Sequence, residues 1–282
     1  TKVIWEFFKT KSGYRSVQGF STVKVSTNSS RLPQGETEIA ADEKGHVVVA
    51  WMDGSPAYQA RMTLRAAYSN DGGDTFAPDR QVNQDLILGD PTMAMDTNGT
   101  VYLGALRKDS RFTYRDLAMV LFRSYDFGAT WSTPVVINDN DIFNDRDWIT
   151  VDGKNRIHAV YSPRLSLPDG NFDRPVYYQR SEDSGNTFLS QTLINPLSLR
   201  PEGTAGGSAR GIATTDDGRI AVGLQAIPKE NKVSRGGGTV RARGYVSISR
   251  DDGRSFDAPI EFTTPNAIIS AAQGDELGEE RG

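Results

Sequence analysis

Apolar and polar residues alternate in four stretches of the chain, and a short polar turn interrupts each stretch. The stretches are IAADEKGHVVVAW from Ile39, MAMDTNGTVYLGA from Met93, ITVDGKNRIHAVY from Ile149 and IATTDDGRIAVGL from Ile212. Alternation at period two on both sides of a turn rich in Asp, Asn and Gly is typical of a β-hairpin. The pattern therefore predicts four two-stranded hairpins, and no segment shows a convincing helical period.

A second motif follows each hairpin, and we call its four copies the box segments. They are YSNDGGDTFAP from Tyr68, RSYDFGATWSTP from Arg123, RSEDSGNTFLS from Arg180 and SRDDGRSFDAP from Ser249, with aspartates at positions 71, 126, 183 and 251 that lie 55, 57 and 68 residues apart. Such an Asp accepts hydrogen bonds from the backbone of its own turn, and the Gly takes a positive φ. The aromatic residue is expected to plug the blade. We therefore assign the box segments a structural role and not a catalytic one.

A hairpin followed by a box segment, repeated with this period, predicts four-stranded antiparallel blades. That is the sequence signature of an all-β protein with a β-propeller fold. The expected blades cover residues 36–89, 90–144, 145–204 and 205–264 of one domain that spans residues 1–282. The termini, residues 1–35 and 265–282, are expected to contribute a further blade, which gives five or six blades in total.

Composition excludes several classes of function. The chain has 36 acidic and 32 basic residues, a formal net charge of −4, and no long run of one sign, which argues against nucleic-acid binding. It has no cysteine, so disulfides, thiolate metal sites and a cysteine nucleophile are excluded. No stretch approaches the ~18 apolar residues that would span a bilayer. The chain begins at Thr1 and not at Met, so we expect a processed or partial chain.

The four box segments resemble the Asp-box repeats of the sialidase superfamily, also called bacterial neuraminidase repeats. The resemblance covers roughly residues 36–259 and includes GDPTMAMDTNGTVYL from Gly89 and GTAGGSARGIATTDDGRIAVG from Gly203. It implies a β-propeller, but the same fold also carries binding modules and scaffolds. In this family three arginines hold the substrate carboxylate, a Tyr activated by a Glu attacks, and an Asp donates the proton.

Only part of that catalytic set matches. Arg31 stands in an Arg-Leu-Pro triplet similar to the family's first arginine motif, but Gly35 occupies the matching strand position. Asp53 lies near the place of the acid, although Asp53-Gly54 is also an ordinary turn. Tyr245 and Tyr161 are the candidate nucleophiles, each with the alternative of an amphipathic tyrosine on a sheet edge.

The first strand of the last blade offers the best-placed arginine, Arg210. Glu202, a further candidate catalytic residue, lies close enough in sequence to pair with it. No third arginine completes the family's set.

Alignment of the four blades on their first strands gives a more consistent picture. It places a mostly acidic group at equivalent positions, where inner strands meet one mouth of the central channel: Glu36, Glu38, Asp90, Asp145, Arg146, Asp147, Ser208 and Arg210. We predict ligand binding there by Arg31, Glu36, Asp90, Asp145, Arg146 and Arg210. An acidic group suits a cation, a set of sugar hydroxyls or a basic partner better than an anionic sugar.

The sequence requires no cofactor. The loop NDNDIFNDRDW from Asn138 holds Asp139, Asp141 and Asp145, and such oxygen-rich loops bind Ca²⁺, although a solvated loop is the alternative.

Taken together, the sequence predicts an extracytoplasmic propeller that binds a glycan or a partner protein at the channel mouth, alone or within a larger assembly. The alternative is an exo-glycosidase of the sialidase type that hydrolyses terminal sialic acid or a related sugar.

Overall fold

All secondary structure in the described part of the chain is β. The computed structural model describes residues 9–10, 13–14, 23–27, 34–54, 62–84, 87–108, 117–138, 144–145, 147–163, 165–166, 172–195, 204–215, 217–228 and 243–262. Strands β1 to β20 lie in these ranges. No helix long and apolar enough to cross a membrane was found among the described residues. The predicted all-β class is confirmed.

Sixteen of these strands form four sheets of four antiparallel strands each. The first sheet contains β3 (Gln34–Ala41), β4 (Val47–Asp53), β5 (Thr63–Ser69) and β6 (Arg80–Gln81). The second contains β7 (Ile87–Met95), β8 (Val101–Lys108), β9 (Leu117–Ser124) and β10 (Val135–Asn138).

The other two sheets repeat this order. The third contains β11 (Trp148–Val151), β12 (Ile157–Tyr161), β15 (Tyr177–Ser181) and β16 (Thr192–Leu193). The fourth contains β17 (Thr204–Thr214), β18 (Ile220–Pro228), β19 (Arg243–Ser249) and β20 (Ile260–Glu261). Two short pairs lie outside the sheets: β1 (Lys9–Thr10) with β2 (Gly13–Tyr14), and β13 (Leu165–Ser166) with β14 (Phe172–Asp173).

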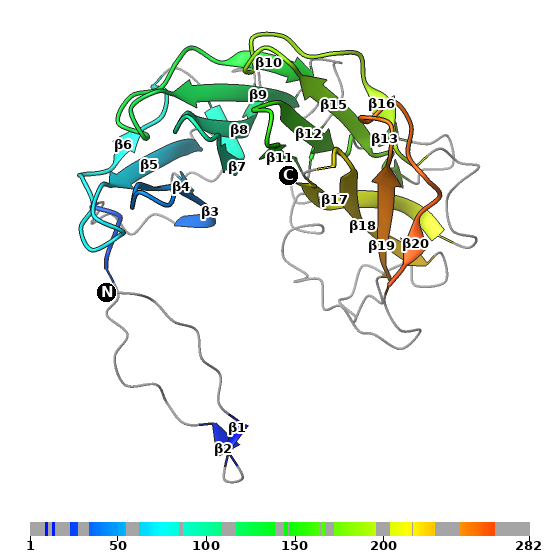
Figure 1. The fold of residues 1–282 in the computed structure, drawn as a ribbon, viewed down its shortest axis with the longest axis horizontal. Coiled ribbons are helices and arrows are strands. Elements are labelled where there is room, and N and C mark those ends of the chain that lie inside the picture. Colours follow the sequence, from blue (N-terminus) through cyan, green and yellow to red (C-terminus); the bar gives the residue numbers. More distant parts are fainter. Residues whose placement is uncertain are drawn as a thin grey trace.

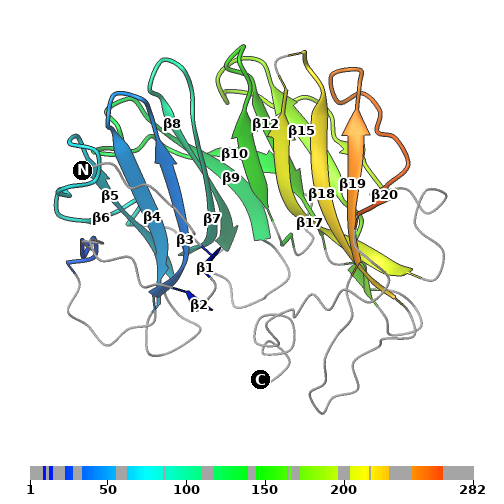
Figure 2. The same cartoon turned by 60° about the horizontal axis from the view of Figure 1, so that its bottom comes forward.

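The four sheets stand around one axis as the blades of a propeller (Figure 1). The first strand of each blade, β3, β7, β11 or β17, lies on the inner side of the arc, and the fourth strand lies outside. Inner strands contact their neighbours in chain order, and Figure 2 shows the blades side by side in the same order. The predicted hairpins β3–β4, β7–β8, β11–β12 and β17–β18 all form. The further blade predicted from the termini falls almost entirely outside the described residues.

The hydrophobic core lies between adjacent blades and is therefore divided into layers. In β8, Val101 and Leu103 face the first blade, whereas Tyr102 faces the third. Successive side chains of a strand point to opposite faces, so one blade supplies two layers. The layer between the third and fourth blades includes Val160 and Val222.

Each box segment folds into the turn that the sequence predicts. The aspartate Oδ1 accepts the backbone N–H of the residue four positions later at 2.8 to 2.9 Å in all four copies. The glycine at the end of the turn has a φ between 81° and 92° in each, at Gly73, Gly128, Gly185 and Gly253. The aromatic residue also packs against a hydrophobic cluster in each copy: Phe76, Trp131, Phe188 and Phe256.

The box segments also join the blades. A Cβ on Gly253 of the fourth blade would lie 2.1 Å from the Tyr178 ring of the third, and one on Gly128 of the second blade would lie 2.8 Å from Val48 of the first. The equivalent Gly73 of the first blade has nothing within 4 Å of that position. Glycine therefore lets each later box turn pack closely against the preceding blade.

Candidate functional site

Two inner strands begin with the same strained bulge. In β3, Glu36 and Thr37 together oppose one residue of β4, and in β7, Asp90 and Pro91 oppose one residue of β8. Glu36 has a φ of 49° and Asp90 a φ of 47°, which is the left-handed region that side chains other than Gly rarely adopt. Bulges redirect side chains, and strain of this kind gathers at functional sites. The bulges therefore mark the beginning of the inner strands as the candidate site.

Five carboxyl groups from three blades interact at this end of the inner strands, and we call them the axial carboxyl cluster. Its members are Glu36 and Glu38 of β3, Asp90 of β7, and Asp145 and Asp147, which precede β11. The carboxyl groups of Glu36 and Asp90 share a hydrogen bond. Such a bond needs one proton, since two ionised carboxylates offer only acceptors.

Three members of the cluster hold their protons more tightly than isolated carboxyl groups do: Glu38, Asp90 and Asp147. Burial raises the pKa of Asp90 well above its ordinary value, and the hydrogen bond and negative charge of Glu36 raise it further. Burial also raises the pKa of Asp147 strongly, and the charges of Asp145 and Glu36 add to the effect. Burial alone raises the pKa of Glu38. Like charges and desolvation thus act in the same direction.

Asp147 is the innermost member of the cluster. Its residue is 6% exposed, and its Oδ2 is buried without any hydrogen-bond partner. Glu36, in contrast, is exposed, and Glu38 and Asp90 are half-buried. The cluster therefore runs from solvent at Glu36 to a buried, unpartnered oxygen at Asp147. Buried polar atoms without a partner are uncommon in folded proteins and need an explanation.

One arginine pairs with the cluster, and another lies on the neighbouring inner strand β17. Arg174 forms an ion pair of 2.7 Å between its Nη1 and Asp145 Oδ2, so the Asp145 charge has a partner. Arg210 is the bulged residue of β17, between the pairs Ala209–Leu224 and Gly211–Gly223. The structure therefore brings the predicted residues Glu36, Asp90 and Asp145 together. The predicted residues Arg31, Arg146 and Glu202 lie outside the described residues.

Asp53, the predicted acid, lies at the end of β4 and belongs to a different group of charges. It is 4% exposed, and its Oδ2 lies 3.7 Å from the Nε of Arg65. Arg65 also binds Asp79, whose pKa is lowered by hydrogen bonds from Thr27 and Arg65 despite partial burial. Asp53 is thus held in a charged group on β4 and β5 of the first blade.

Tyr245, the predicted nucleophile, lies in the core layer between the third and fourth blades. It is 2% exposed, belongs to the third strand of its blade, and its hydroxyl is buried. Burial raises the pKa of its phenol. A nucleophilic tyrosine needs a base and a lowered pKa, so this position argues against the catalytic role.

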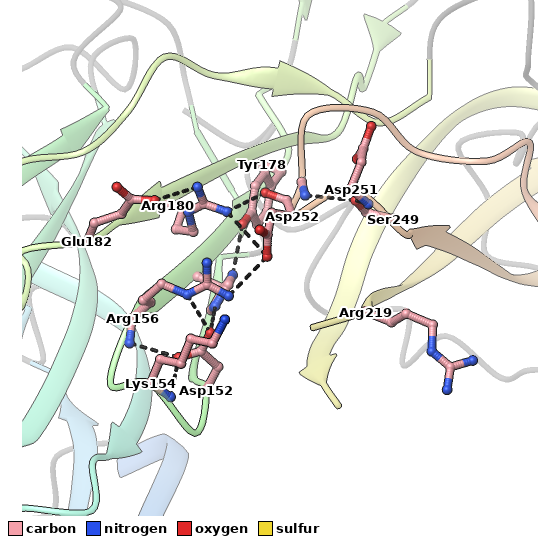
Figure 3. A network of polar contacts seen from close by, with 12 residues as sticks. Asp152, Lys154, Arg156, Tyr178, Arg180, Glu182, Arg219, Ser249, Asp251 and Asp252 are labelled. Atoms are coloured by element: carbon pink, nitrogen blue, oxygen red, sulfur yellow. Dashed lines mark hydrogen bonds and ion pairs between the residues drawn. The ribbon is translucent and has the colours of Figure 1, made fainter. Parts of the chain in front are cut away.

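A second polar group joins the third and fourth blades through the turn between β11 and β12 and the box turn between β19 and β20 (Figure 3). Arg156 donates to Asp152 at 2.7 Å and to Asp252 at 3.1 Å, and Arg180 donates to Glu182 at 2.6 Å and to the backbone carbonyl of Asp252. Hydrogen bonds from Arg156 and the arginine charges lower the pKa of Asp252. Because opposite charges meet here, this group stabilises the contact between two blades, and we assign it no ligand.

The metal prediction concerns a loop that is mostly outside the described residues. Asp139 and Asp141 fall there, and only Asp145 of the predicted set is described. Among the described residues, no group of three or more His, Asp or Glu side chains has an arrangement that could hold a metal ion. The Ca²⁺ site of the loop stays a prediction.

Sequence reasoning missed three features of these charged groups. Arg174 follows a loop without a motif, and no pattern pairs it with Asp145. The pairing of Arg65 with Asp53 and Asp79 and the arginine contacts to Asp252 depend on residues brought together by the fold. Glu36 and Asp90 do occupy equivalent positions, six residues before the hairpin aspartates Asp42 and Asp96, but this spacing alone does not indicate a bulge.

The structure is similar to solved carbohydrate-active propellers, although the sequence is not. No protein-family model matches the chain, and no curated protein sequence matches it. An ulvan lyase of polysaccharide lyase family PL25 aligns with a TM-score of 0.57 at 14% identity, over 83% of this chain and 59% of the lyase. A leech intramolecular trans-sialidase aligns with a TM-score of 0.58 at 10% identity, over 82% of this chain and 51% of the enzyme.

An endo-arabinase from Bacteroides thetaiotaomicron aligns over more of its length. The TM-score is 0.54 at 13% identity, over 86% of this chain and 85% of the arabinase. At such identities the likeness establishes the fold, and the predicted β-propeller is confirmed. The chain spans little more than half of the lyase and of the trans-sialidase.

Proposed function

We propose that this propeller is an extracytoplasmic glycan-binding module whose ligand contacts the axial carboxyl cluster. The observation that carries the proposal is the pair of strained bulges that bring the Glu36 and Asp90 carboxyl groups into hydrogen-bonding contact. Such strain costs of order 1–3 kcal/mol for each residue, and the proximity of like charges adds to that cost. A ligand that uses these groups accounts for both.

The chemistry of the cluster favours a ligand rich in hydrogen-bond donors. Carboxylates accept hydrogen bonds, and a sugar ring offers several hydroxyl donors in a fixed arrangement. An anionic sugar would meet repulsion from the same carboxylates. The structural neighbours support a carbohydrate ligand, since they include an arabinase, a lyase of ulvan and a trans-sialidase.

The test is a glycan array followed by calorimetric titration of the best ligands. We expect binding of oligosaccharides that carry no negative charge, and a loss of at least about tenfold in affinity in the double variant Glu36→Gln with Asp90→Asn, which corresponds to about 1.4 kcal/mol. Asp217→Asn is the matched control, because Asp217 is an exposed carboxylate of the fourth blade paired with Arg219 at 2.7 Å. An unchanged affinity in the double variant would place the ligand elsewhere.

A fluorogenic sialoside assay tests the alternative of a sialidase-type hydrolase. The binding proposal expects no turnover. Hydrolysis that disappears in Arg210→Ala would replace it with the enzymatic alternative, in which arginines hold the sugar carboxylate.

A further inference from the structure

We infer that the axial carboxyl cluster selects a protonated amino sugar, a glycan unit with a free ammonium group, which binds against Asp147. The inference rests on the proposed function and names its ligand class. Two independent observations carry it. Carboxyl groups of three blades interact with one another near the start of the inner strands, and the most buried of them ends in an oxygen that has no hydrogen-bond partner.

The unpartnered oxygen indicates which chemical group the ligand supplies. Asp147 Oδ2 requires a donor, and in a buried position a charged donor is roughly twice as effective as a neutral one. The surrounding charges of Glu36, Glu38 and Asp145 disfavour a second anion and favour a cation. A neutral hydroxyl would satisfy the oxygen but would leave the repulsion between the carboxylates in place.

Other cations fit the site less well. No described group has the arrangement that a metal ion needs. Arg174 is already paired with Asp145 through a contact of 2.7 Å. In the proposed complex the ammonium group of the sugar binds Asp147, and the ring hydroxyls donate to Glu38 and Asp90.

Binding of this ligand should release protons. In the empty site the hydrogen bond between Glu36 and Asp90 retains a proton, and the arriving ammonium charge favours the ionised carboxylates. Each carboxyl group that ionises releases one proton to the buffer. A neutral sugar bound in the same place carries no charge that favours the ionised carboxylates, so its binding should not release protons.

The experiment compares two ligands that differ in one group: a glucosamine tetramer and the matching N-acetylglucosamine tetramer. Each is titrated at pH 5.5, where the sugar amine is charged, in two buffers with different ionisation enthalpies. We expect the amine form to bind at least about tenfold more tightly and only its binding enthalpy to depend on the buffer. Asp147→Asn should remove this preference, and Asp217→Asn should preserve it. If Asp147→Asn does not fold, Asp90→Asn replaces it. The measurement is then the release of protons on binding, which this variant should reduce.

Each remaining outcome has a distinct meaning. Equal binding of both tetramers overturns the amino-sugar inference but supports a glycan-binding module. Binding of neither, together with a negative array, overturns the proposed function as well. Amine selectivity that survives in Asp147→Asn overturns the assignment to this oxygen. If a lysine tetrapeptide binds as tightly as the glucosamine tetramer, the cluster does not select a sugar, and a basic protein partner is indicated.

Discussion

Asp183 and Asp147 belong to the same blade, yet their carboxyl groups lie in opposite surroundings. Asp183 in the box turn accepts hydrogen bonds from Thr187 N, Thr187 Oγ1 and Ser181 Oγ at 2.6 to 2.9 Å. These bonds lower its pKa to about 2. Asp147 beside the inner strand is buried among other carboxyl groups, and its pKa is strongly raised. Hydrogen bonds within the chain thus stabilise the ionised carboxylate of the box turn. The carboxyl group in the axial carboxyl cluster is instead destabilised in its ionised form by burial and by neighbouring charges.

The difference separates fold-maintaining residues from candidate ligand contacts. A carboxylate whose hydrogen bonds are all made within the chain has no free acceptor for a ligand, and its substitution lowers the free energy of unfolding. A group that is buried, repelled and unpartnered weakens the folded state by its presence. Natural proteins retain such groups mainly at functional sites, where stability is exchanged for function. Three substitutions test the contrast.

The largest effect is expected at the box turn of the fourth blade. An alanine at Gly253 combines a left-handed φ of 81° with a Cβ 2.1 Å from the Tyr178 ring, which cannot move away because it bonds His158 at 2.8 Å and packs against Phe256. We expect Gly253→Ala to lower the free energy of unfolding by about 3 kcal/mol or more, as the sum of strain and overlap. Urea unfolding followed by tryptophan fluorescence measures it.

Gly73→Ala is the matched control for that substitution. Gly73 has the same box position and a φ of 92°, but open space at the Cβ position. Only the backbone term of about 1–2 kcal/mol should therefore remain. Equal losses at both glycines would show that the box turns do not lock the blades together.

The next effect concerns Asp152, a carboxylate whose hydrogen bonds are all made within the polar group between the third and fourth blades. It accepts Arg156 Nε at 2.7 Å and the backbone N–H groups of Lys154 and Arg156 at 2.9 Å, and despite burial these hydrogen bonds lower its pKa to about 2. We expect Asp152→Asn to destabilise the protein by about 1–3 kcal/mol at pH 7. Because the folded pKa is lowered, the contribution of Asp152 is present above pH ~4 and is lost as the pH falls toward 2.

Acid titration of thermal stability checks this assignment. The wild-type protein should lose more stability between pH 4 and 2 than Asp152→Asn does. Asp217→Asn provides the contrast, because the pKa of Asp217 is also about 2 but its side chain is 57% exposed, so solvent screens the ion pair and little change is expected. A large loss there would contradict the importance given to burial.

The sequence predicted the features of this fold that depend on short spacings. Hairpins and box turns are encoded within about a dozen residues each, so alternation and turn residues were sufficient to identify them. The alignment of blades also placed Glu36, Asp90 and Asp145 correctly at one end of the inner strands, since each repeat keeps its register. The strained φ values at Glu36 and Asp90 were not predicted, because two-residue bulges do not disturb the alternation enough to be seen.

Contacts between blades were beyond such reasoning. Tyr245 has the sequence pattern of a strand residue, and only the packing of the fourth blade on the third shows that its ring faces a core layer. Gly253 meets Tyr178, which precedes it by 75 residues, and no local pattern encodes that distance. The same holds for Arg174 and Asp145. Residue types and register were thus predictable, but partners across blades were not.

The smallest effect has the opposite sign and is expected at Asp147. Its raised pKa means that the folded protein binds a proton more tightly than the unfolded chain, so stability falls as the pH rises from about 4 toward the folded pKa. Asp147→Asn removes the charge and keeps the shape, and it should raise the free energy of unfolding at pH 8, because the wild-type protein must then bury an ionised carboxyl group. At pH 4 the wild-type carboxyl group is protonated, so the two proteins should unfold alike. Urea titrations at both pH values provide the comparison, and a variant less stable at pH 8 would mean that Asp147 belongs with the satisfied carboxylates of the box turns.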